Sequence, residues 1–172
     1  WILATFVCLV LDRIQARRVL ARNIAEAARQ NSGVLPTMPW GPSMGLRLWR
    51  FAAGVCAGAA VGVKWNSLFF VAAMGLLTVF WDINARRIVG LEKWGLTALV
   101  RDGLPAFFQM IGVGLLVYLS TWAGWFQSSN AYFRRWAVEN PGKGVMWLPE
   151  DLRSLWEYHV SAFKFHSGLS SP

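Results

Sequence analysis

Lys64 is the residue of this chain whose surroundings most clearly predict chemistry. It is the only charged residue in the apolar stretch 51–81. An ammonium group placed in hydrocarbon costs roughly 2.5–3.5 kcal/mol, so it must either reach the membrane interface or meet an anion. Trp65 beside it could stack on a sugar or lipid, and Asn66 could donate hydrogen bonds. The group predicts an anion site, foremost for a phosphate; the alternative is a lysine that simply extends into water.

His159 and His166 form the second group of candidate residues. Pro149 and Gly168 are suited to begin and end a helix around them. Seven residues of helix place the two imidazoles on one face but about 10 Å apart along the axis. This spacing argues against one shared metal ion, so we predict no metal site. The histidines could line a polar substrate groove; the alternative is an ordinary amphipathic surface helix.

The composition indicates a membrane protein. The chain is 55% hydrophobic, contains 11 Trp and 11 Phe, and has only 15% charged residues. Its net charge of +8 would be compatible with nucleic-acid binding. The basic residues lie beside apolar runs, however, where they serve as signals of membrane topology. We therefore predict contact with membrane lipid and no nucleic-acid partner.

The order of apolar and basic stretches predicts an all-α membrane protein with six segments. They are the end of a transmembrane helix (1–11), a cytoplasmic basic loop that begins with an amphipathic surface helix (12–50), a short transmembrane helical hairpin (51–81), a second cytoplasmic loop (82–102), a transmembrane helix (103–126) and an extracytoplasmic, partly helical loop (127–172). The chain reads as an internal fragment of a larger polytopic protein, because it starts with only half a membrane span.

The hairpin follows from length and charge. One straight helix over 51–81 would rise about 46 Å, against a hydrocarbon core of about 30 Å. The flanking loops are both rich in arginine, so the positive-inside rule places both in the cytoplasm. An even number of spans must then join them, with a turn near 64–66. This topology puts Lys64 at the extracytoplasmic face.

Two stretches of the chain resemble a known family. The run LRLWRFAAGVCAGAAVGVKWNSLFFVAAMGLLTVFWD, residues 46–82, is similar to the glycine-rich Lys-Trp membrane segment of the bacterial, actinobacterial-type protein O-mannosyltransferases (glycosyltransferase family 39). The run SLWEYHVSAFKFHSGLSSP, residues 154–172, resembles the external loop after the seventh span of that family. The family's pattern normally continues into His-Pro-Tyr, and this sequence stops before it.

The resemblance implies a GT-C-type transmembrane helix bundle in the cell membrane, with an extracytoplasmic active site. Such an enzyme moves mannose from polyprenyl-phosphate-mannose to Ser or Thr hydroxyls of secreted or membrane proteins. It implies that Lys64 holds the donor phosphate and that His166 shapes the donor and acceptor site, with Trp65, Asn66 and, less directly, His159 lining it. The lipid-linked donor is a substrate, and no cofactor is expected.

The catalytic base is expected outside these residues. In the family it is an acidic residue of an Asp-Glu pair in the first external loop, which we place upstream of Trp1. We therefore assign no catalytic residue to this fragment and expect the 172 residues alone to be inactive. Two other functions stay open: a related carrier-dependent sugar transferase that acts on lipid or wall polymer, and an anion transporter subunit.

Overall fold

The computed structural model describes residues 1–34 and 36–169. These residues form helices, turns and loops, and no strand occurs among them. The chain divides into two compact units, Trp1–Ser120 and Thr121–Pro172. The all-α prediction is therefore confirmed over the described part of the chain. The end of the predicted external-loop motif, residues 170–172, lies outside it.

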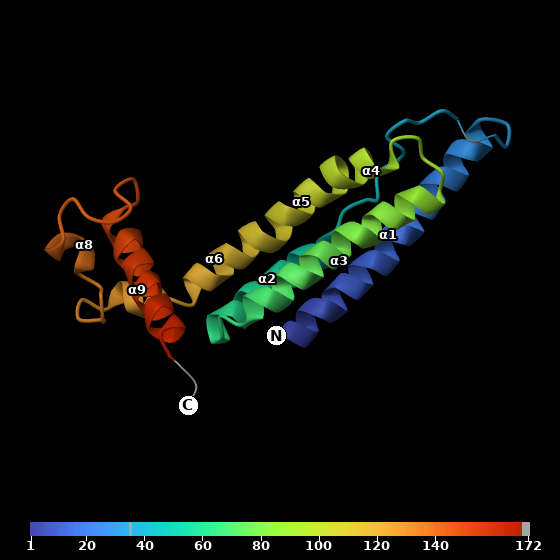
Figure 1. Ribbon diagram of the computed structural model, residues 1–172. Coiled ribbons are helices and arrows are strands. Elements are labelled where there is room, and N and C mark those ends of the chain that lie inside the picture. Colours follow the sequence, from blue (N-terminus) through green and yellow to red (C-terminus); the bar gives the residue numbers. More distant parts are fainter. Residues whose placement is uncertain (35, 170–172) are drawn as a thin grey trace. The chain divides into compact units, whose positions relative to one another are not determined.

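The first unit is a bundle of long helices that lie side by side (Figure 1). Its helices are α1 (Ile2–Gln30), α2 (Leu48–Val63), α3 (Ser67–Ile88) and a composite helix made of α4 (Trp94–Thr97), η1 (Ala98–Gly103), α5 (Leu104–Phe107), η2 (Phe108–Gly112) and α6 (Val113–Ser120). Two of these, Ser67–Ile88 and Trp94–Ser120, are long and apolar enough to cross a membrane, and Leu48–Val63 is a shorter apolar helix.

Helix α1 differs from the sequence expectation. The predicted boundary at Asp12, between a membrane span and a surface helix, falls inside one continuous helix of 29 residues. Thr5, Leu9, Asp12, Ala16 and Leu20 are all buried, so one face of the helix packs on the bundle across that boundary. Asp12 does not end the helix because Arg47, directly before α2, and Arg50, in α2, neutralise it there. The segment 12–30 therefore continues α1 along the bundle.

Helices α2 and α3 are joined by the tripeptide 64–66, where the sequence argument places a turn. Both helices extend further than the predicted hairpin, from Leu48 at one end to Ile88 at the other. Asp82, predicted to open a cytoplasmic loop, is buried inside α3. The predicted loop 82–102 is consequently helical at both ends, and only a short connection around Gly90 separates α3 from α4.

The composite helix begins nine residues earlier than the predicted span and ends at Ser120 rather than Phe126. Two of its turns, η1 and η2, are π-helical. Pro105 is the second residue after η1 and has no N–H for the carbonyl four residues before it, which favours the wider turn there. The Leu104 N–H accordingly donates to the Leu99 carbonyl, five residues back.

The second unit contains α7 (Ala123–Gln127), α8 (Trp136–Glu139) and α9 (Glu150–Ser167). Pro149 and Gly168 flank α9, where the sequence places its start and stop. Helix α8 is fixed on α9 by two hydrogen bonds. The Ala137 N–H donates to Ser154 Oγ over 3.0 Å, and Arg153 Nη2 donates to the Ala137 carbonyl over 3.1 Å. The prediction that the segment is partly helical is thus confirmed over its described residues, 127–169.

Candidate functional site

Lys64 ends α2 in an extended conformation, with φ −155° and ψ 123°. Its backbone N–H donates to the Ala60 carbonyl over 3.0 Å, and its own carbonyl accepts from the Ser67 N–H over 2.9 Å. The residue is exposed, as is Asn66. Among the described residues no carboxylate forms an ion pair with the Lys64 ammonium. The turn therefore presents a cation whose charge is available to an external anion.

Trp65 is held in place by the composite helix. Its Nε1–H donates to the hydroxyl of Tyr118 in α6 over 3.1 Å. On the other side of the turn, the buried Ser67 hydroxyl donates to the Ala60 carbonyl over 3.0 Å and so caps the end of α2. The turn that carries Lys64 is thus fixed by side-chain bonds on both flanks.

Close packing of α2 on the composite helix fixes where this turn lies along the composite helix. A Cβ atom on Gly54 would lie 2.2 Å from the Gln109 carbonyl oxygen, and one on Gly58 would lie 2.3 Å from that of Gly114. The two helix backbones therefore touch along these glycines, as small-residue faces allow in membrane bundles. This packing brings Tyr118 within reach of Trp65.

His159 lies in the second unit in a half-buried aromatic setting. Its ring is 5.1 Å from Trp122 and 5.7 Å from Tyr158, centroid to centroid. Its Nδ1 lies 2.6 Å from the Leu155 carbonyl oxygen. A carbonyl only accepts, so Nδ1 carries the proton and Nε2 is the acceptor nitrogen of the neutral ring. Burial lowers the pKa of His159, and the Leu155 hydrogen bond opposes that shift.

His166 has a different setting from His159. It is exposed near the end of α9, with its ring 5.4 Å from that of Phe165. No cluster of potential metal ligands occurs in the described part of the chain. The structure thus brings Lys64, Trp65 and Asn66 together on one turn, and it places His159, but not His166, in an aromatic cluster.

The sequence analysis missed a buried ionic network in the first unit. It consists of Asp12, Arg47, Arg50, Asp82, Arg86 and Asp102. Arg47 and Arg50 both bind Asp12 and Asp82; the Arg50 Nη2–Asp82 Oδ2 bond is 2.8 Å long. Arg86 donates two hydrogen bonds to the Asp102 carboxylate, of 2.5 and 2.9 Å. Three arginines and three aspartates compensate one another, so the network is neutral.

The network had a signal in the sequence. Asp12, Asp82 and Asp102 each lie at the end of an apolar run, the position at which a loop was expected. An aspartate bordering hydrocarbon needs a cation. Arg47 lies directly before the apolar helix α2, and Arg50 lies in its first turn. Tyr118 and Trp122 were also missed as neighbours of the candidate residues, because their partners come from distant parts of the chain.

Comparison with curated proteins gives a consistent set of relatives. The chain is 36% identical over 172 residues to the polyprenol-phosphate-mannose--protein mannosyltransferase of Mycobacterium tuberculosis. This match covers 99% of this chain and 32% of that protein. It is 35% identical to the Mycolicibacterium smegmatis protein of the same name over 98% of the chain, and 31% identical to that of Corynebacterium glutamicum over 78%. The chain thus spans about a third of the length of the Mycobacterium tuberculosis and Mycolicibacterium smegmatis proteins. No family model and no solved structure matches it.

Proposed function

Since nearly the whole chain matches a segment of polyprenol-phosphate-mannose--protein mannosyltransferases, the resemblance seen in the sequence is confirmed, and we propose that the protein shares their activity. It transfers mannose from polyprenyl-phosphate-mannose to Ser or Thr hydroxyls of secreted or membrane proteins. The observation that carries this proposal is the extent of the match, 99% of the chain at 36% identity.

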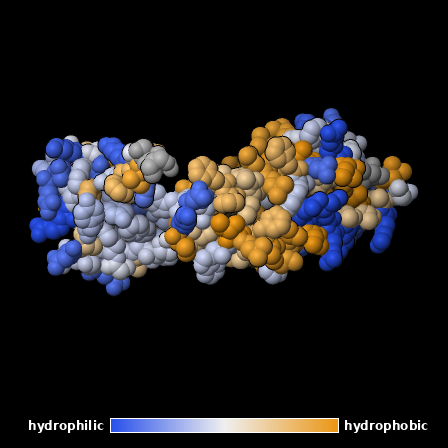
Figure 2. Space-filling model, turned by 60° about the horizontal axis from the view of Figure 1, so that its bottom comes forward, coloured by the Kyte–Doolittle hydropathy of each residue, from blue (hydrophilic) through white to orange (hydrophobic). Residues whose placement is uncertain are grey.

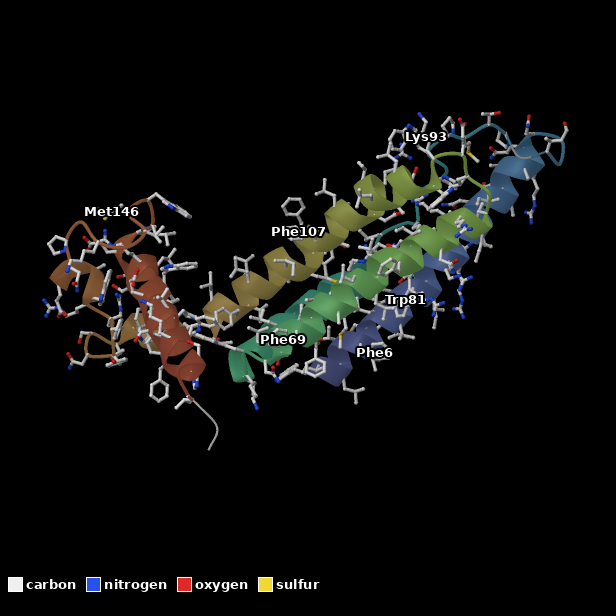
Figure 3. The ribbon with its side chains drawn as sticks, in the orientation of Figure 1. Phe6, Phe69, Trp81, Lys93, Phe107 and Met146 are labelled. Atoms are coloured by element: carbon white, nitrogen blue, oxygen red, sulfur yellow. The ribbon has the colours of Figure 1, made fainter. Side chains whose placement is uncertain are left out.

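We propose a multi-pass GT-C-type bundle in the cell membrane, with the Lys64 turn at the extracytoplasmic face. Large apolar side chains on the candidate spans are exposed; Phe69 is 76% and Phe108 62% exposed. Figure 3 shows Phe107 pointing away from the bundle, and Figure 2 shows apolar side chains over the middle of the first unit. Such surfaces suit contact with lipid.

In this proposal Lys64 binds the phosphate of the donor. When the acceptor oxygen attacks the anomeric carbon of mannose, the bond from that carbon to the phosphate oxygen breaks and negative charge grows on the carrier phosphate. An ammonium group placed against that oxygen stabilises the charge in the transition state. The fixed turn favours this role, because it holds the backbone from which the Lys64 side chain extends.

The acceptor hydroxyl also needs a general base, and we propose that it lies outside these 172 residues. The buried aspartates of the first unit are each held by arginine, and Asp151 is paired with Arg134. These four carboxylates already serve as ion-pair partners of arginine, so we assign none of them as the base. We assign His166, His159, Trp65 and Asn66 to the lining of the donor and acceptor site.

The test is a transfer assay in membranes from cells that express the complete gene. Labelled polyprenyl-phosphate-mannose and a Thr/Pro-rich peptide are supplied, and Lys64→Met is compared with the wild type. We expect at least a 100-fold lower rate, about 3 kcal/mol of lost transition-state stabilisation. Lys143→Met, a matched change at an exposed lysine of the second unit, should leave the rate unchanged.

Three results would count against parts of the proposal. Transfer that survives in Lys64→Met would leave the enzyme class intact and reduce Lys64 to a residue that reaches water. Labelled mannose found only in lipid or wall polymer would indicate a related carrier-dependent transferase. A wild-type protein that transfers no mannose, but moves an anion across the membrane, would indicate the transporter.

A further inference from the structure

A cavity of about 390 Å³ opens beside the buried ionic network, far from the Lys64 turn. It is lined by the loop 43–47, by Arg50 and Arg86, and by four residues of the composite helix: Arg101, Asp102, Pro105 and Gln109. Arg47, Arg50, Arg86 and Asp102 are buried and form its floor. The exposed residues of its lining, which we call the rim, are Ser43, Gly45, Leu46, Arg101 and Pro105.

The cavity carries a positive charge. Its floor arginines are matched one for one by the three aspartates of the network. Arg101 on the rim has no carboxylate partner among the described residues; its Nη1 donates to the Gly41 carbonyl over 3.2 Å and it lies over the Trp40 ring. The uncompensated charge therefore sits at the mouth, where an anion can reach it.

One residue that lines the cavity, Gln109, has a side-chain acceptor that lacks a donor. Gln109 Oε1 is buried without a hydrogen-bond partner among the described residues. A buried, unpaired oxygen costs about 1–3 kcal/mol unless a donor satisfies it. Gln109 belongs to the π-helical turn η2, and Arg101 belongs to η1. Such turns occur frequently at functional sites. An anion that also bears a hydroxyl would suit both groups.

The position of the cavity points to a lipid as the source of that anion. Arg50 lies thirteen residues before the end of α2, roughly 20 Å along the helix from the Lys64 turn, which is most of a bilayer core. Arg13 lies 4.7 Å from the ring centre of Trp81, and Lys93 lies 5.7 Å from that of Trp40. Tryptophan paired with basic residues is typical of the level of lipid headgroups.

The rim continues into an apolar surface on the same helix. Arg101, Pro105 and Phe108 follow one another along this helix, and all three are exposed. Leu104 is 54% and Phe108 62% exposed, and Leu46 on the opposite rim is 67% exposed. A phosphate at Arg101 would thus have room for acyl chains along α5 and η2.

We propose that this cavity binds the headgroup of an anionic, hydroxyl-bearing phospholipid of the inner leaflet. The phosphate pairs with Arg101 and accepts from the Ser43 hydroxyl, and a headgroup hydroxyl donates to Gln109 Oε1. The proposal depends on membrane insertion of the bundle but not on mannose transfer, so the two can fail independently.

The test is a native mass spectrometry titration of the full-length protein in detergent with phosphatidylglycerol, phosphatidylcholine and inorganic phosphate. Ser43 Oγ accepts the Gly45 N–H over 3.0 Å, and both Asp and Asn can replace that acceptor. Ser43→Asp adds a negative charge at the mouth, whereas Ser43→Asn does not. We expect Arg101→Gln and Ser43→Asp each to weaken phosphatidylglycerol binding about tenfold relative to Ser43→Asn.

Two control variants test whether the lipid binds at the cavity. Arg22→Gln removes the same charge from an exposed position of α1 outside the cavity and should leave the affinity unchanged. Gln109→Leu should weaken phosphatidylglycerol but not phosphatidylmethanol, which has the same charge and no glycerol hydroxyls. Equal affinities in Ser43→Asp, Ser43→Asn and Arg101→Gln would overturn the site. The lipid assignment would be overturned if only inorganic phosphate displaced the bound lipid and the protein did not prefer phosphatidylglycerol to phosphatidylcholine.

Discussion

The hydrogen bond from Trp65 to Tyr118 supports the Lys64 turn, and its contribution can be measured. Trp65→Phe removes the donor to Tyr118 and keeps an aromatic ring. We expect a loss of about 0.5–1.5 kcal/mol in the free energy of unfolding, measured by thermal unfolding in detergent. Tyr118→Phe removes the acceptor, so the double variant should cost less than the sum of the single ones. Strict additivity would show that the bond contributes nothing.

His159 predicts a pH dependence of the second unit. Burial among aromatic rings lowers its pKa, so the folded state binds the proton more weakly than the unfolded chain. The resulting stability is complete above the unfolded pKa of about 6.5 and is lost as the pH falls through the folded pKa. We expect a steeper fall in unfolding temperature between about pH 7 and pH 5 in the wild type than in His159→Gln.

A control for this prediction lies on the same helix. His166→Gln changes the exposed histidine of α9 and should retain the steep dependence of the wild type. If His159→Gln instead unfolds with the same pH profile as the wild type, burial of His159 does not set the acid stability of this unit.

At the scale of elements, the pairing of α2 with the composite helix depends on glycine. A methyl group on Gly58 would meet the Gly114 carbonyl oxygen at 2.3 Å and Val117 Cβ at 2.8 Å, both too close to accommodate without moving a backbone. Gly58→Ala should therefore cost about 1–3 kcal/mol of stability, despite the better helix propensity of alanine. Chemical denaturation in detergent measures the loss.

Gly75 provides the matched control for Gly58. It lies in α3, and a Cβ atom there would have no neighbour within 4 Å. Gly75→Ala should gain about 0.5–1 kcal/mol from helix propensity alone. If both variants were stabilised, the backbones of α2 and the composite helix would not touch as described.

Much of the element level could be predicted from the sequence because it depends on local patterns. Apolar runs predict the helices, Pro149 and Gly168 predict the limits of α9, and arginine-rich flanks predict a turn near Lys64. The continuity of α1 could not be predicted in this way. Asp12 interrupts the apolar pattern, and its neutralising partner Arg47 lies 35 residues further along the chain.

For the first unit as a whole, the ionic network links helices that are distant in sequence. Asp12 lies on α1, Arg50 on α2, Asp82 and Arg86 on α3, and Asp102 on the composite helix. One sequence shows that these charges border apolar runs, but not which of them meet. The same limit applies to the candidate site: the Lys64 turn is local, whereas its Tyr118 support comes from a helix more than 50 residues away.

The network predicts that replacing one partner of a buried ion pair costs more stability than replacing both partners. Arg86→Met leaves Asp102 buried without its two-bond partner, which should cost about 3–5 kcal/mol in the free energy of unfolding. Adding Asp102→Leu removes the orphaned charge and should restore most of the loss, because desolvation of the pair offsets much of its attraction.

The Arg134–Asp151 pair of the second unit is the reference for this experiment, since the Asp151 side chain is 55% exposed. Asp151→Asn should cost less than about 1 kcal/mol, as water screens an exposed pair. The test is the free energy of unfolding of these three variants and of the wild type, measured under one set of detergent conditions. A loss in Arg86→Met no larger than that in Asp151→Asn would mean that water reaches the network. The charges would then not hold the four helices together, and the cavity beside them would be a wet surface hollow rather than a built site.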